Sequence, residues 1–407
     1  MKNRMANERG LGIAIAAMAL TVLLVTACAP PTTPSQGEEK IVEIGSLPSL
    51  TGGGASAEQP GFQGLMDYVG YFDEGKGIPG VTIKVAWIDV SGDMGRFISG
   101  YRKLVDRGVP VMQSNWGQGV EALSSQFGKD QIAFITGSPT GDLIYPPAWV
   151  FAFGALQGEA ATAVFDYFME NWREERPPKL QFSIIDIPWG WGLVEEATEY
   201  AETLGFEVLP TEPCPYVILD AIPQLVRIRE RKADLVYIQH VIGGGGPIMR
   251  DAERLGLRDM MKFAGSEWLL GAPLIKMVPI GIEGFLSPRS LPWVDETEVP
   301  GIRTMVDTQQ RYHGKVYQGP EYIAGWVYGA IMCEAVKGAL EEVGYENLDG
   351  AAVKRALERM SFDLDGVATF TYGPEDRRGT RDYAVYQVQG GKIVHVSDYR
   401  EVPILVP

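Results

Sequence analysis

Near the start of the chain the pattern of apolar and polar positions changes from that of a strand to that of a helix. Residues 41–50 (IVEIGSLPSL) predict a short strand that runs into the glycine-rich loop TGGGASAEQPG. Apolar side chains then recur at three- and four-residue spacing from Phe62 to Phe72, which predicts a helix, and residues 81–89 (VTIKVAWID) alternate again. This order predicts a βαβ unit with a parallel pair of strands.

Three successive predicted strands each end in a polar, glycine-containing loop. The first runs into TGGGASA, the strand at 109–113 into SNWGQG and the strand at 131–135 into TGSPTGD, with helices expected at 97–106 and 121–127. Ligands collect at the carboxyl ends of parallel strands, where the amino termini of helices present unpaired N–H groups. These loops therefore form the first candidate ligand site.

The pattern then begins again and predicts a second α/β unit. Helices are expected at 159–172, 193–204, 222–231 and 247–255, and strands at 180–186, 207–209, 234–239, 261–264 and 282–286. Three of these strands run into IPWGWG, HVIGGGG and GSEW. Helices at 299–312, 322–343 and 351–360 and strands at 367–372, 383–389 and 392–399 follow. We predict an α/β fold with two doubly wound, Rossmann-like units.

Composition narrows the class of protein. The composition, with 45% hydrophobic and 22% charged residues, is typical of a globular protein. The length of 407 residues favours two domains. The formal net charge of -16, without a basic stripe, argues against a nucleic-acid partner.

Residues 1–27 are typical of an export signal, with Lys2, Arg4 and Arg9 ahead of an apolar run. Its end, LVTAC, resembles the lipobox of bacterial lipoproteins, so we expect Cys28 to be acylated; a plain signal peptide or an uncleaved anchor is the alternative. Residues 28–40 are proline-rich and polar, as in a flexible tether. Together these features predict a lipid-anchored protein on the extracytoplasmic side of the cell membrane, in the periplasm or at the cell surface.

The two remaining cysteines do not indicate a disulfide by their spacing. Cys214 lies in the turn-like string EPCPY and Cys333 on an apolar helix face. An oxidising compartment would permit a bridge, but we favour two unpaired, buried thiols.

Enzyme motifs are weak or missing. Gly52, Gly54 and Ala57 match the dinucleotide fingerprint G-x-G-x-x-A after a strand, but no acidic residue ends the second strand at the spacing that a ribose partner requires. The chain has no G-x-S-x-G, H-E-x-x-H or C-x-x-C string, and its three histidines are isolated in sequence. We expect no catalytic residues, no metal site and no cofactor, with a dinucleotide-dependent enzyme as a remote alternative.

Several strings occur in an order that resembles the type I periplasmic binding proteins of ABC importers, in particular the leucine/isoleucine/valine-binding family. They are GSLPSLTG with its helix and GIPG, FGALQGEAATAVFDY, IIDIPWGWG, ADLVYIQH, AERLGL and FAGSEW, and the likeness covers nearly all of 41–399. The resemblance implies two lobes joined by crossover strands near 151–154, 285–289 and 362–368. The first lobe would combine 41–153 with 287–365 and the second 154–286 with 366–407, and a hinge would close over the ligand.

The resemblance also implies ligand contacts in the three loops of the first lobe. In amino-acid binders of the family, hydroxyls and backbone N–H groups of the second and third loops hold the substrate carboxylate, and the residues here supply the same donors. The candidates are Thr51, Ala55, Ser114, Asn115, Trp116, Gly137, Ser138 and Thr140. The alternative is that the serines and threonines only form turns and cap helices.

In the second lobe the resemblance implies four contacts. Trp189 falls beside a position where the family commonly has tyrosine, and Gln239 and His240 fall where another contact residue sits. Glu267 falls on an acidic position that faces the substrate ammonium in amino-acid binders, which suits a buried cation; an ordinary surface glutamate is the alternative.

The predicted cleft loops depart from the family by their tryptophans. A pocket for a small aliphatic ligand does not require so many indole side chains as these loops contain, at Trp116, Trp189, Trp191 and Trp268. Unless they fill the core, they favour a flat or cationic ligand through stacking or cation–π contact.

The resemblance therefore implies a substrate-binding lipoprotein of an ABC transporter, which captures a small molecule between its lobes and presents it to a membrane permease without catalysis. The expected ligand is an amino acid of the branched-chain type or a similar small polar molecule. An aromatic carboxylate or amide as ligand, or a ligand sensor of the same fold, are the alternatives.

Overall fold

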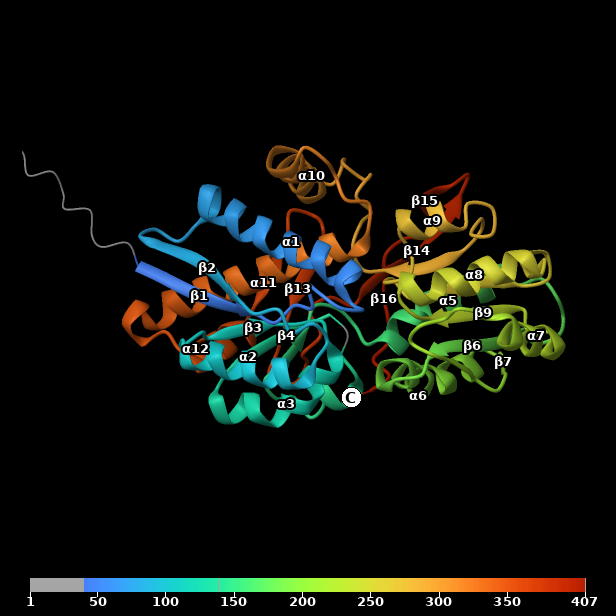
Figure 1. Ribbon diagram of the computed structural model, residues 1–407, viewed down its shortest axis with the longest axis horizontal. Helices are drawn as coiled ribbons and strands as arrows, with labels where there is room; N and C mark the ends of the chain where they lie inside the picture. Colours follow the sequence, from blue (N-terminus) through green and yellow to red (C-terminus); the bar gives the residue numbers. More distant parts are fainter. Residues whose placement is uncertain (1–39, 138, 407) are drawn as a thin grey trace, which may run out of the picture. The chain divides into compact units, whose positions relative to one another are not determined.

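A parallel five-stranded sheet forms from the first part of the chain (Figure 1). The computed structural model describes residues 40–137 and 139–406, so the predicted signal peptide at 1–27, Cys28, nearly all of the tether and Ser138 lie outside the described residues. The strand order is β2-β1-β3-β4-β5, and all neighbours are parallel. The strands are β1 (Lys40–Ser46), β2 (Val81–Trp87), β3 (Val111–Gln113), β4 (Ala133–Thr136) and β5 (Val150–Ala152).

Helices from two distant parts of the sequence belong to this sheet. From the early part come α1 (Ala55–Tyr71), the π-helical turn η1 (Phe72–Lys76), α2 (Met94–Asp106), α3 (Gly117–Asp130) and α4 (Gly141–Ile144). From the later part come α10 (Pro300–His313), α11 (Pro320–Val343), the short 3-10 turn η3 (Tyr345–Asn347) and α12 (Gly350–Leu357). Figure 1 shows α11, in orange, beside α1, in blue.

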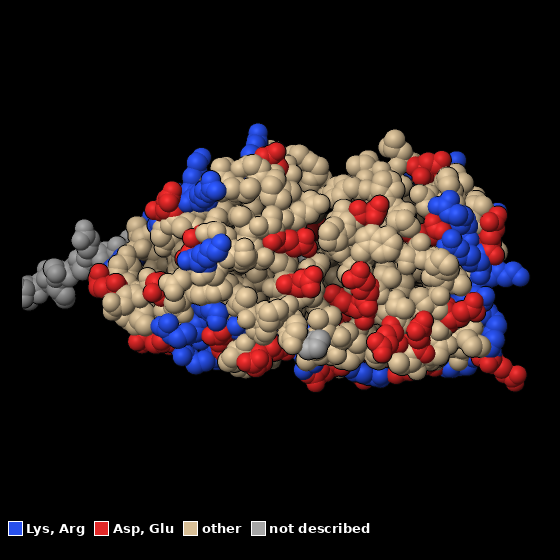
Figure 2. Space-filling model, turned by 90° about the horizontal axis from the view of Figure 1, so that it is seen from below, with Lys and Arg blue, Asp and Glu red and all other residues tan. Residues whose placement is uncertain are grey.

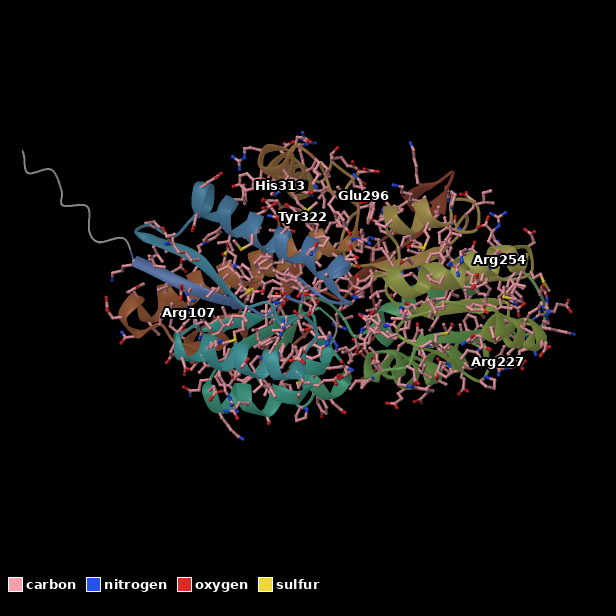
Figure 3. All side chains as sticks on the ribbon, viewed as in Figure 1. Arg107, Arg227, Arg254, Glu296, His313 and Tyr322 are labelled. Atoms are coloured by element: carbon pink, nitrogen blue, oxygen red, sulfur yellow. The ribbon has the colours of Figure 1, made fainter. Side chains whose placement is uncertain are left out.

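Glycines allow α1 and α11 to lie unusually close. A Cβ on Gly64 would stand 2.2 Å from the carbonyl oxygen of Tyr322, and one on Gly325 would stand 1.8 Å from that of Gly61. Asp67 on α1 also joins these helices: its Oδ2 accepts from the Tyr322 hydroxyl at 2.6 Å and from His313 Nε2 on α10 at 2.7 Å. Figure 3 labels Tyr322 and His313, which lie close together. Close packing and these bonds attach α10 and α11 to the first sheet.

The second sheet is mixed. Its order is β15-β14-β11-β10-β9-β6-β7, with β8 also on β6 and β16 on β14. The strands up to β11 are parallel, whereas β14 runs antiparallel to β11 and to β15. The strands are β6 (Lys179–Ile185), β7 (Glu207–Val208), β8 (Glu212–Cys214), β9 (Leu235–Gln239), β10 (Lys262–Gly265), β11 (Leu286–Arg289), β14 (Asp382–Gln389), β15 (Lys392–His395) and β16 (Arg400–Glu401).

Five α-helices accompany the second sheet in the described chain. They are α5 (Gln157–Asn171), α6 (Pro188–Thr203), α7 (Ile222–Arg231), α8 (Ile242–Arg254) and α9 (Ala272–Met277), with a 3-10 turn η2 (Leu257–Asp259). The short elements α4, α9 and β8 have no counterpart in the predicted pattern, because segments of three to six residues show too little periodicity.

The third connection between the sheets lies later than the predicted stretch at 362–368. That stretch instead belongs to a hairpin of β12 (Ser361–Asp363) and β13 (Thr369–Thr371), which bonds to α10 through Gly301 N–H and the Asp365 carbonyl at 2.9 Å. The chain runs toward β14 through 377–381, where Arg378 lies beside Ala152 of β5. The alternating pattern at 367–372 predicted the strand β13, but it did not show that this strand pairs with β12.

Helix α1 also begins earlier than the apolar pattern indicates, at Ala55 rather than Phe62. Its first turn is held by tertiary bonds: Gln59 Nε2 donates to the Leu50 carbonyl at 2.8 Å, and the Glu58 carboxylate accepts from the Ser49 N–H. Glycines in the loop weaken the helical signal there, and these contacts offset the loss.

Helix α11 is long and apolar enough to cross a membrane, but 78% of its most apolar window is buried inside the protein. Within the described chain it is therefore a core helix of the first sheet's layer. Cys333 on this helix and Cys214 on β8 are both buried and free, which confirms the interpretation as unpaired thiols.

Candidate ligand-binding site

In the first loop, predicted contacts Thr51 and Ala55 follow β1. The Thr51 hydroxyl donates to Asp89 Oδ2 at 2.6 Å and contacts the Ser91 hydroxyl, so it joins the loops after β1 and β2. These bonds, and others from backbone N–H groups, lower the pKa of Asp89 against the opposing effect of its desolvation. Ala55 opens α1.

In the second loop, Ser114 is buried and its hydroxyl donates to the Leu47 carbonyl at 2.8 Å. Asn115 uses Oδ1 to accept the Gly137 N–H of the third loop at 3.2 Å. The side chain of Trp116 packs on Phe97, with ring centroids 5.5 Å apart. The hydroxyl of Ser114 and the N–H of Gly137 thus already have hydrogen-bond partners inside the protein.

The third loop brings a residue from α11 into the site. A Cβ on Gly137 would stand 1.8 Å from the Tyr328 hydroxyl, so only glycine leaves room for this phenol. The same hydroxyl is buried and has no hydrogen-bond partner in the described chain. Thr140 donates to Glu121 Oε1 at 3.4 Å, and Ser138 lies outside the described residues.

In the second sheet, Gln239 and His240 end β9. Gln239 Nε2 donates to Gln157 Oε1 on α5 at 3.3 Å. His240 Nδ1 accepts the Val241 N–H at 3.0 Å, and its Nε2 lies 3.4 Å from the Pro215 carbonyl. Burial lowers the pKa of His240, so its imidazole is neutral and donates through Nε2.

Glu267 follows β10 and is 6% exposed, so it is not a surface glutamate. Burial raises its pKa to about 7, against the opposing effects of Arg289 and of the N–H and hydroxyl of Ser290. The Ser290 hydroxyl lies 3.5 Å from Oε2. Glu267 forms no direct ion pair with any side chain that the structure describes, and the Arg289 charge only partly offsets its burial.

The four tryptophans have different surroundings. Trp189, in the first turn of α6, is half-buried against the main core, and Trp268 is 7% exposed. Trp191 is 38% exposed and donates to Asp186 Oδ1 at 2.8 Å. The side chain of Trp116 borders an open hollow of about 620 Å³, lined by Gly92, Asp93, Met94, Gln118, Glu121 and Ala122 as well. Only residues of the first sheet's layer line that hollow, so it is not a site shared by both sheets.

The loops of the two sheets meet. Phe153, just after β5, has its ring centroid 5.7 Å from Tyr328 of α11 and 6.1 Å from Trp268. Nearby, a Cβ on Gly192 of α6 would stand 3.6 Å from Thr140 Cγ2. Figure 2 shows a furrow at this junction. The carboxyl ends of strands from both sheets thus face one another, as ligand sites in such sheets require.

Buried polar atoms without a partner gather around these residues. They come from the layers of both sheets and include Thr136 Oγ1, Gln157 Nε2, Trp189 Nε1, Gln239 Oε1, Trp268 Nε1, Arg289 Nη1 and the Tyr328 hydroxyl. Buried polar atoms are nearly always hydrogen-bonded, so a set of them at one junction is what a site for a polar molecule requires. A metal site is not indicated, since no group of His, Cys, Asp and Glu in the described chain could hold an ion.

Sequence reasoning missed five residues near this junction, namely Glu58, Gln157, Glu196, Tyr216 and Tyr328. Glu196 on α6 accepts the Gly158 N–H at 2.9 Å and also the Gly141 N–H from the other sheet's layer, and burial raises its pKa to about 8. Tyr216 lies near Glu58, whose charge raises its pKa in addition to burial. The string FGALQGEAA contained a signal for Gln157, whereas Tyr328 lies in an apolar helix with no local sign of function.

A family model described as "Periplasmic binding protein" matches residues 41–392. The chain belongs to this periplasmic binding protein family. Its fold is the type I α/β fold of the family, with two lobes that each contain one of the sheets, as the sequence predicts. Proteins of this family are extracytoplasmic and bind small solutes for ABC transporters, which confirms the expected class of protein.

Solved structures of periplasmic binding proteins share this fold. A branched-chain amino acid ABC transporter protein from Thermus thermophilus with bound valine is 24% identical, with a TM-score of 0.82 over 90% of this chain and 98% of that one. A fatty acid ABC transporter substrate-binding protein from Thermomonospora curvata is 17% identical (TM-score 0.80, coverage 91% and 96%). A solute-binding protein from Rhodopseudomonas palustris BisB5 in complex with 3,4-dihydroxybenzoic acid is also 17% identical (0.76, 89% and 98%). A search of curated proteins found no match.

Proposed function

We propose that this periplasmic binding protein captures an amino acid, of the branched-chain type or of similar small polar form, between its lobes and delivers it to a membrane permease. The observation that carries the ligand class is Glu267, a buried carboxylate at the lobe junction that forms no ion pair with a described side chain. An ammonium group would supply the missing charge. The T. thermophilus relative with bound valine supports the same class.

The lobes would act by closing on the ligand. We place the first lobe at 41–153 and 290–376 and the second at 154–289 and 382–406, with the third connection at 377–381; the predicted boundary at 287 falls inside β11, which pairs with β10 and β14 of the second sheet. Ligand contacts from both sides are made together only in the closed form, so a ligand shifts the balance toward closure by its differential affinity. The predicted contacts at Thr140, Trp189, Gln239 and Glu267 would complete the site, and the orphan polar atoms of Gln239 and Trp189 support this assignment.

An aromatic carboxylate or amide is the second candidate ligand. It is favoured by Trp189 and Trp268, whose indole N–H groups are buried without an acceptor, and by the relative in complex with 3,4-dihydroxybenzoic acid. Indole rings stack on flat ligands, and their N–H groups would donate to a carboxylate or a carbonyl.

Thermal-shift screening separates these ligands. Neutral amino acids, aromatic acids and amides would be added to the purified protein, since a ligand of the native state raises the melting temperature in proportion to affinity. For an amino acid, Glu267→Gln should weaken binding by roughly a hundredfold, because a charge-assisted hydrogen bond is lost. Glu230→Gln, at an exposed glutamate of the second lobe, is the control. An unchanged affinity in Glu267→Gln would transfer the assignment to the aromatic class.

We also propose that acylated Cys28 holds the protein at the membrane through the segment 28–40. Replacement of the thiol in Cys28→Ser should release the protein from the membrane fraction, because no acyl chain can then be attached. Retention of the Cys28→Ser protein in membranes would favour an uncleaved anchor instead.

A further inference from the structure

Two glutamines of the second lobe are buried and bonded to each other. Gln157 is the first residue of α5 and is 4% exposed, and Gln239 is the last residue of β9 and is fully buried. Gln239 Nε2 donates to Gln157 Oε1 at 3.3 Å. The NH2 group of Gln157 and the carbonyl oxygen of Gln239 are also buried, and neither has a hydrogen-bond partner in the described chain. One bonded pair of side chains thus contains two buried polar atoms that lack partners.

The bond between the two amides decides which kinds of group stay free. A side-chain amide has one donor nitrogen and one acceptor oxygen, and each glutamine uses one of these two atoms in the bond. If the nitrogen and oxygen of both amides changed places, the donor and acceptor roles would be exchanged, but one NH2 group and one carbonyl oxygen would again be free. Each free atom shares a carbon with an atom of the bond, so one small group can reach both.

An uncharged amide group complements this pair. Its carbonyl oxygen would accept from Gln157, and its NH2 group would donate to Gln239. A carboxylate would instead place an acceptor against the Gln239 oxygen, and an ammonium would place a donor against the Gln157 nitrogen. An alkyl group would leave both atoms unpaired. Since buried polar atoms are costly when they lack partners, the pair favours an amide over these other groups.

The glutamine pair lies next to the loop that contains Glu267. The strand β9 lies between β6 and β10 in the second sheet, and all three strands are parallel. Ser266, directly before Glu267, donates its N–H to the Ile238 carbonyl at 3.1 Å. Its hydroxyl donates to the His240 carbonyl at 3.0 Å. These two carbonyls flank Gln239 in sequence, so the end of β9 is bonded to the loop of the carboxylate that we assign to the ligand ammonium.

Two further donors in the neighbouring loops suit the carboxylate of an amino acid. The indole N–H groups of Trp189 and Trp268 are buried without an acceptor. Trp189 follows β6 and Trp268 follows β10, which are the two neighbours of β9. The ends of three adjacent strands therefore provide a carboxylate, an amide pair and two indole donors. These groups complement an ammonium, an amide and a carboxylate.

We propose that Gln157 and Gln239 form a subsite for an uncharged amide group, and that the solute is an amino acid whose side chain ends in a carboxamide. This inference rests on the proposed function and narrows its ligand to amino acids of the glutamine and asparagine type. The two glutamines determine specificity, because an amino acid without the amide would bury them with both free atoms unpaired.

Isothermal titration calorimetry on the full chain in detergent tests the proposal with ligands that differ at this group. The probes are glutamine, asparagine, glutamate, aspartate, methionine, leucine and benzamide. We expect glutamine or asparagine to bind at least about tenfold more tightly than its own acid, methionine and leucine, because only the amide pairs both buried atoms. Methionine has an uncharged side chain of similar length to that of glutamine, so it separates the loss of the amide from the effect of a negative charge.

The substitution Gln157→Glu changes one free atom and keeps the internal bond. The new carboxylate can still accept from Gln239 Nε2, but an acceptor replaces the free NH2 group. We expect the affinity for the preferred amide ligand to fall by about tenfold or more, and the affinity for leucine to fall less. Gln310→Glu, at an exposed glutamine of α10, is the matched control and should leave both affinities unchanged. The comparison of probes on the wild type does not depend on how well this variant folds.

Two results would overturn the inference and leave the proposed function standing. The first is an acid, methionine or leucine that binds within about tenfold of the better amide ligand or more tightly, which would mean that the free amide atoms meet water rather than the solute. The second is an equal loss of affinity for the amide ligand and for leucine in Gln157→Glu. Binding of benzamide without any amino acid would overturn the amino-acid assignment in both proposals. Failure of every amino acid, amide and aromatic acid to bind would overturn the proposed function itself.

Discussion

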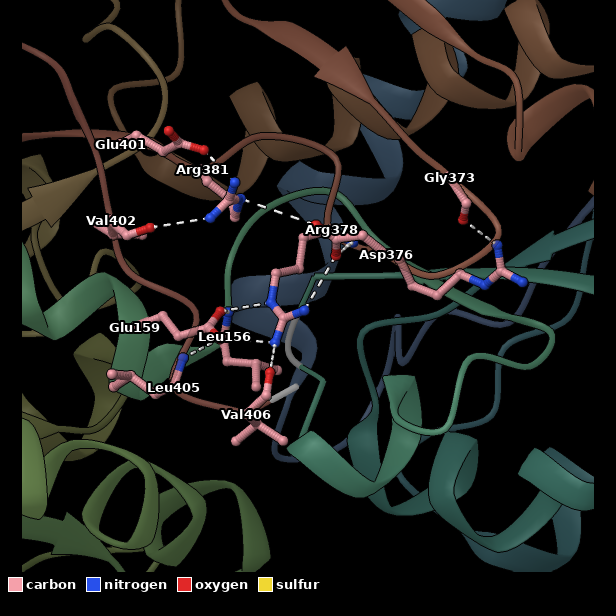
Figure 4. Close-up of polar contacts among 11 residues, drawn as sticks. Leu156, Glu159, Gly373, Asp376, Arg378, Arg381, Glu401, Val402, Leu405 and Val406 are labelled. Atoms are coloured by element: carbon pink, nitrogen blue, oxygen red, sulfur yellow. Dashed lines mark hydrogen bonds and ion pairs between the residues drawn. The ribbon is translucent and has the colours of Figure 1, made fainter.

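Arg378 donates two hydrogen bonds of 2.8 Å to Glu159, from Nε to Oε2 and from Nη2 to Oε1 (Figure 4). Arg378 lies in the third connection between the lobes and Glu159 in the first turn of α5, directly after the first connection. Both side chains are almost fully buried. The same carboxylate accepts the N–H groups of Leu156 and Leu405, so a single ion pair joins two connections and the last residues of the described chain.

This pair predicts a large loss of stability when one partner is removed. Arg378→Met should lower the free energy of unfolding by about 3–5 kcal/mol, because it leaves the Glu159 carboxylate buried and uncompensated. Urea denaturation followed by circular dichroism measures the loss. Arg400→Met, which breaks an exposed pair with Glu170, should cost about 1 kcal/mol or less. Equal losses in the two variants would mean that the buried pair contributes no more to the free energy of unfolding than the exposed pair does.

The side chain of Glu196 bonds to both lobes, so we predict that it stabilises the closed form. Its carboxylate accepts N–H groups of Gly158 and of Gly141, which belong to opposite lobes. Glu196→Ala should therefore shift the protein toward an open form and increase its radius of gyration in small-angle X-ray scattering. We expect only a small effect on unfolding, since burial of this carboxylate raises its pKa and so disfavours its charged form.

The matched control for this experiment is Glu199→Ala, on an exposed position of the same helix. It removes a carboxyl side chain of the same size without the bond between lobes, so its scattering profile should match that of the wild type. An increase of the same size in both variants would assign the change to loss of a carboxyl group from α6 rather than to closure.

Because α1 and α11 pack closely, we predict that one methyl group added between them lowers the stability of the protein. Gly325→Ala should destabilise the protein by about 1–3 kcal/mol, because the new Cβ would overlap the Gly61 carbonyl. Gly75→Ala, where a Cβ meets nothing within 4 Å, is the control for the change in chain entropy. Thermal unfolding of the two variants checks the prediction, and equal melting temperatures would contradict it.

The raised pKa values of the junction carboxylates predict a stability that falls with rising pH. The pKa is about 7 for Glu58 and Glu267 and about 8 for Glu196 in the folded protein, above the ordinary value near 4.5. Between these values the native state binds more protons than the unfolded state, so the free energy of unfolding decreases from about pH 5 to pH 8. The lowered pKa of His240 opposes this trend.

The carboxylates with lowered pKa, such as Asp234 and Asp251, titrate below this window and do not contribute to the slope. Urea midpoints at several pH values without ligand check the prediction. Glu267→Gln should flatten the decrease by on the order of 1 kcal/mol, because its amide does not titrate. A stability that rises from pH 5 to pH 8 in the wild type would contradict it.

Much of the fold could be read from the sequence because strands and helices are decided locally. The strand expected at 180–186 is Lys179–Ile185, and the helix expected at 222–231 is Ile222–Arg231. The order of such elements identified two α/β units. The start of α1 and the third connection could not be read in this way, since each depends on bonds to residues far along the chain.

The site shows the same division. Loop composition after β3 and β4 pointed to the end of the first sheet that lies at the junction of the lobes, and Glu267 lies buried there, at a position selected by its surrounding motif. The hydroxyls of Thr51 and Ser114, by contrast, bond within the protein, to Asp89 and Leu47. Whether a donor is free or occupied depends on its neighbours in space, and no local pattern contains that information.

The sequence by itself determined the kind of elements, their order and the loops at which the strands end, because periodicity and turn residues act over a few positions. Only the tertiary structure decided that Tyr328 and Trp268 both pack on Phe153, and that Arg378 meets Glu159 between the lobes. These residues lie in segments far apart in the chain. Burial, which raises the pKa of the Tyr328 phenol, exists only once both lobes have packed around it.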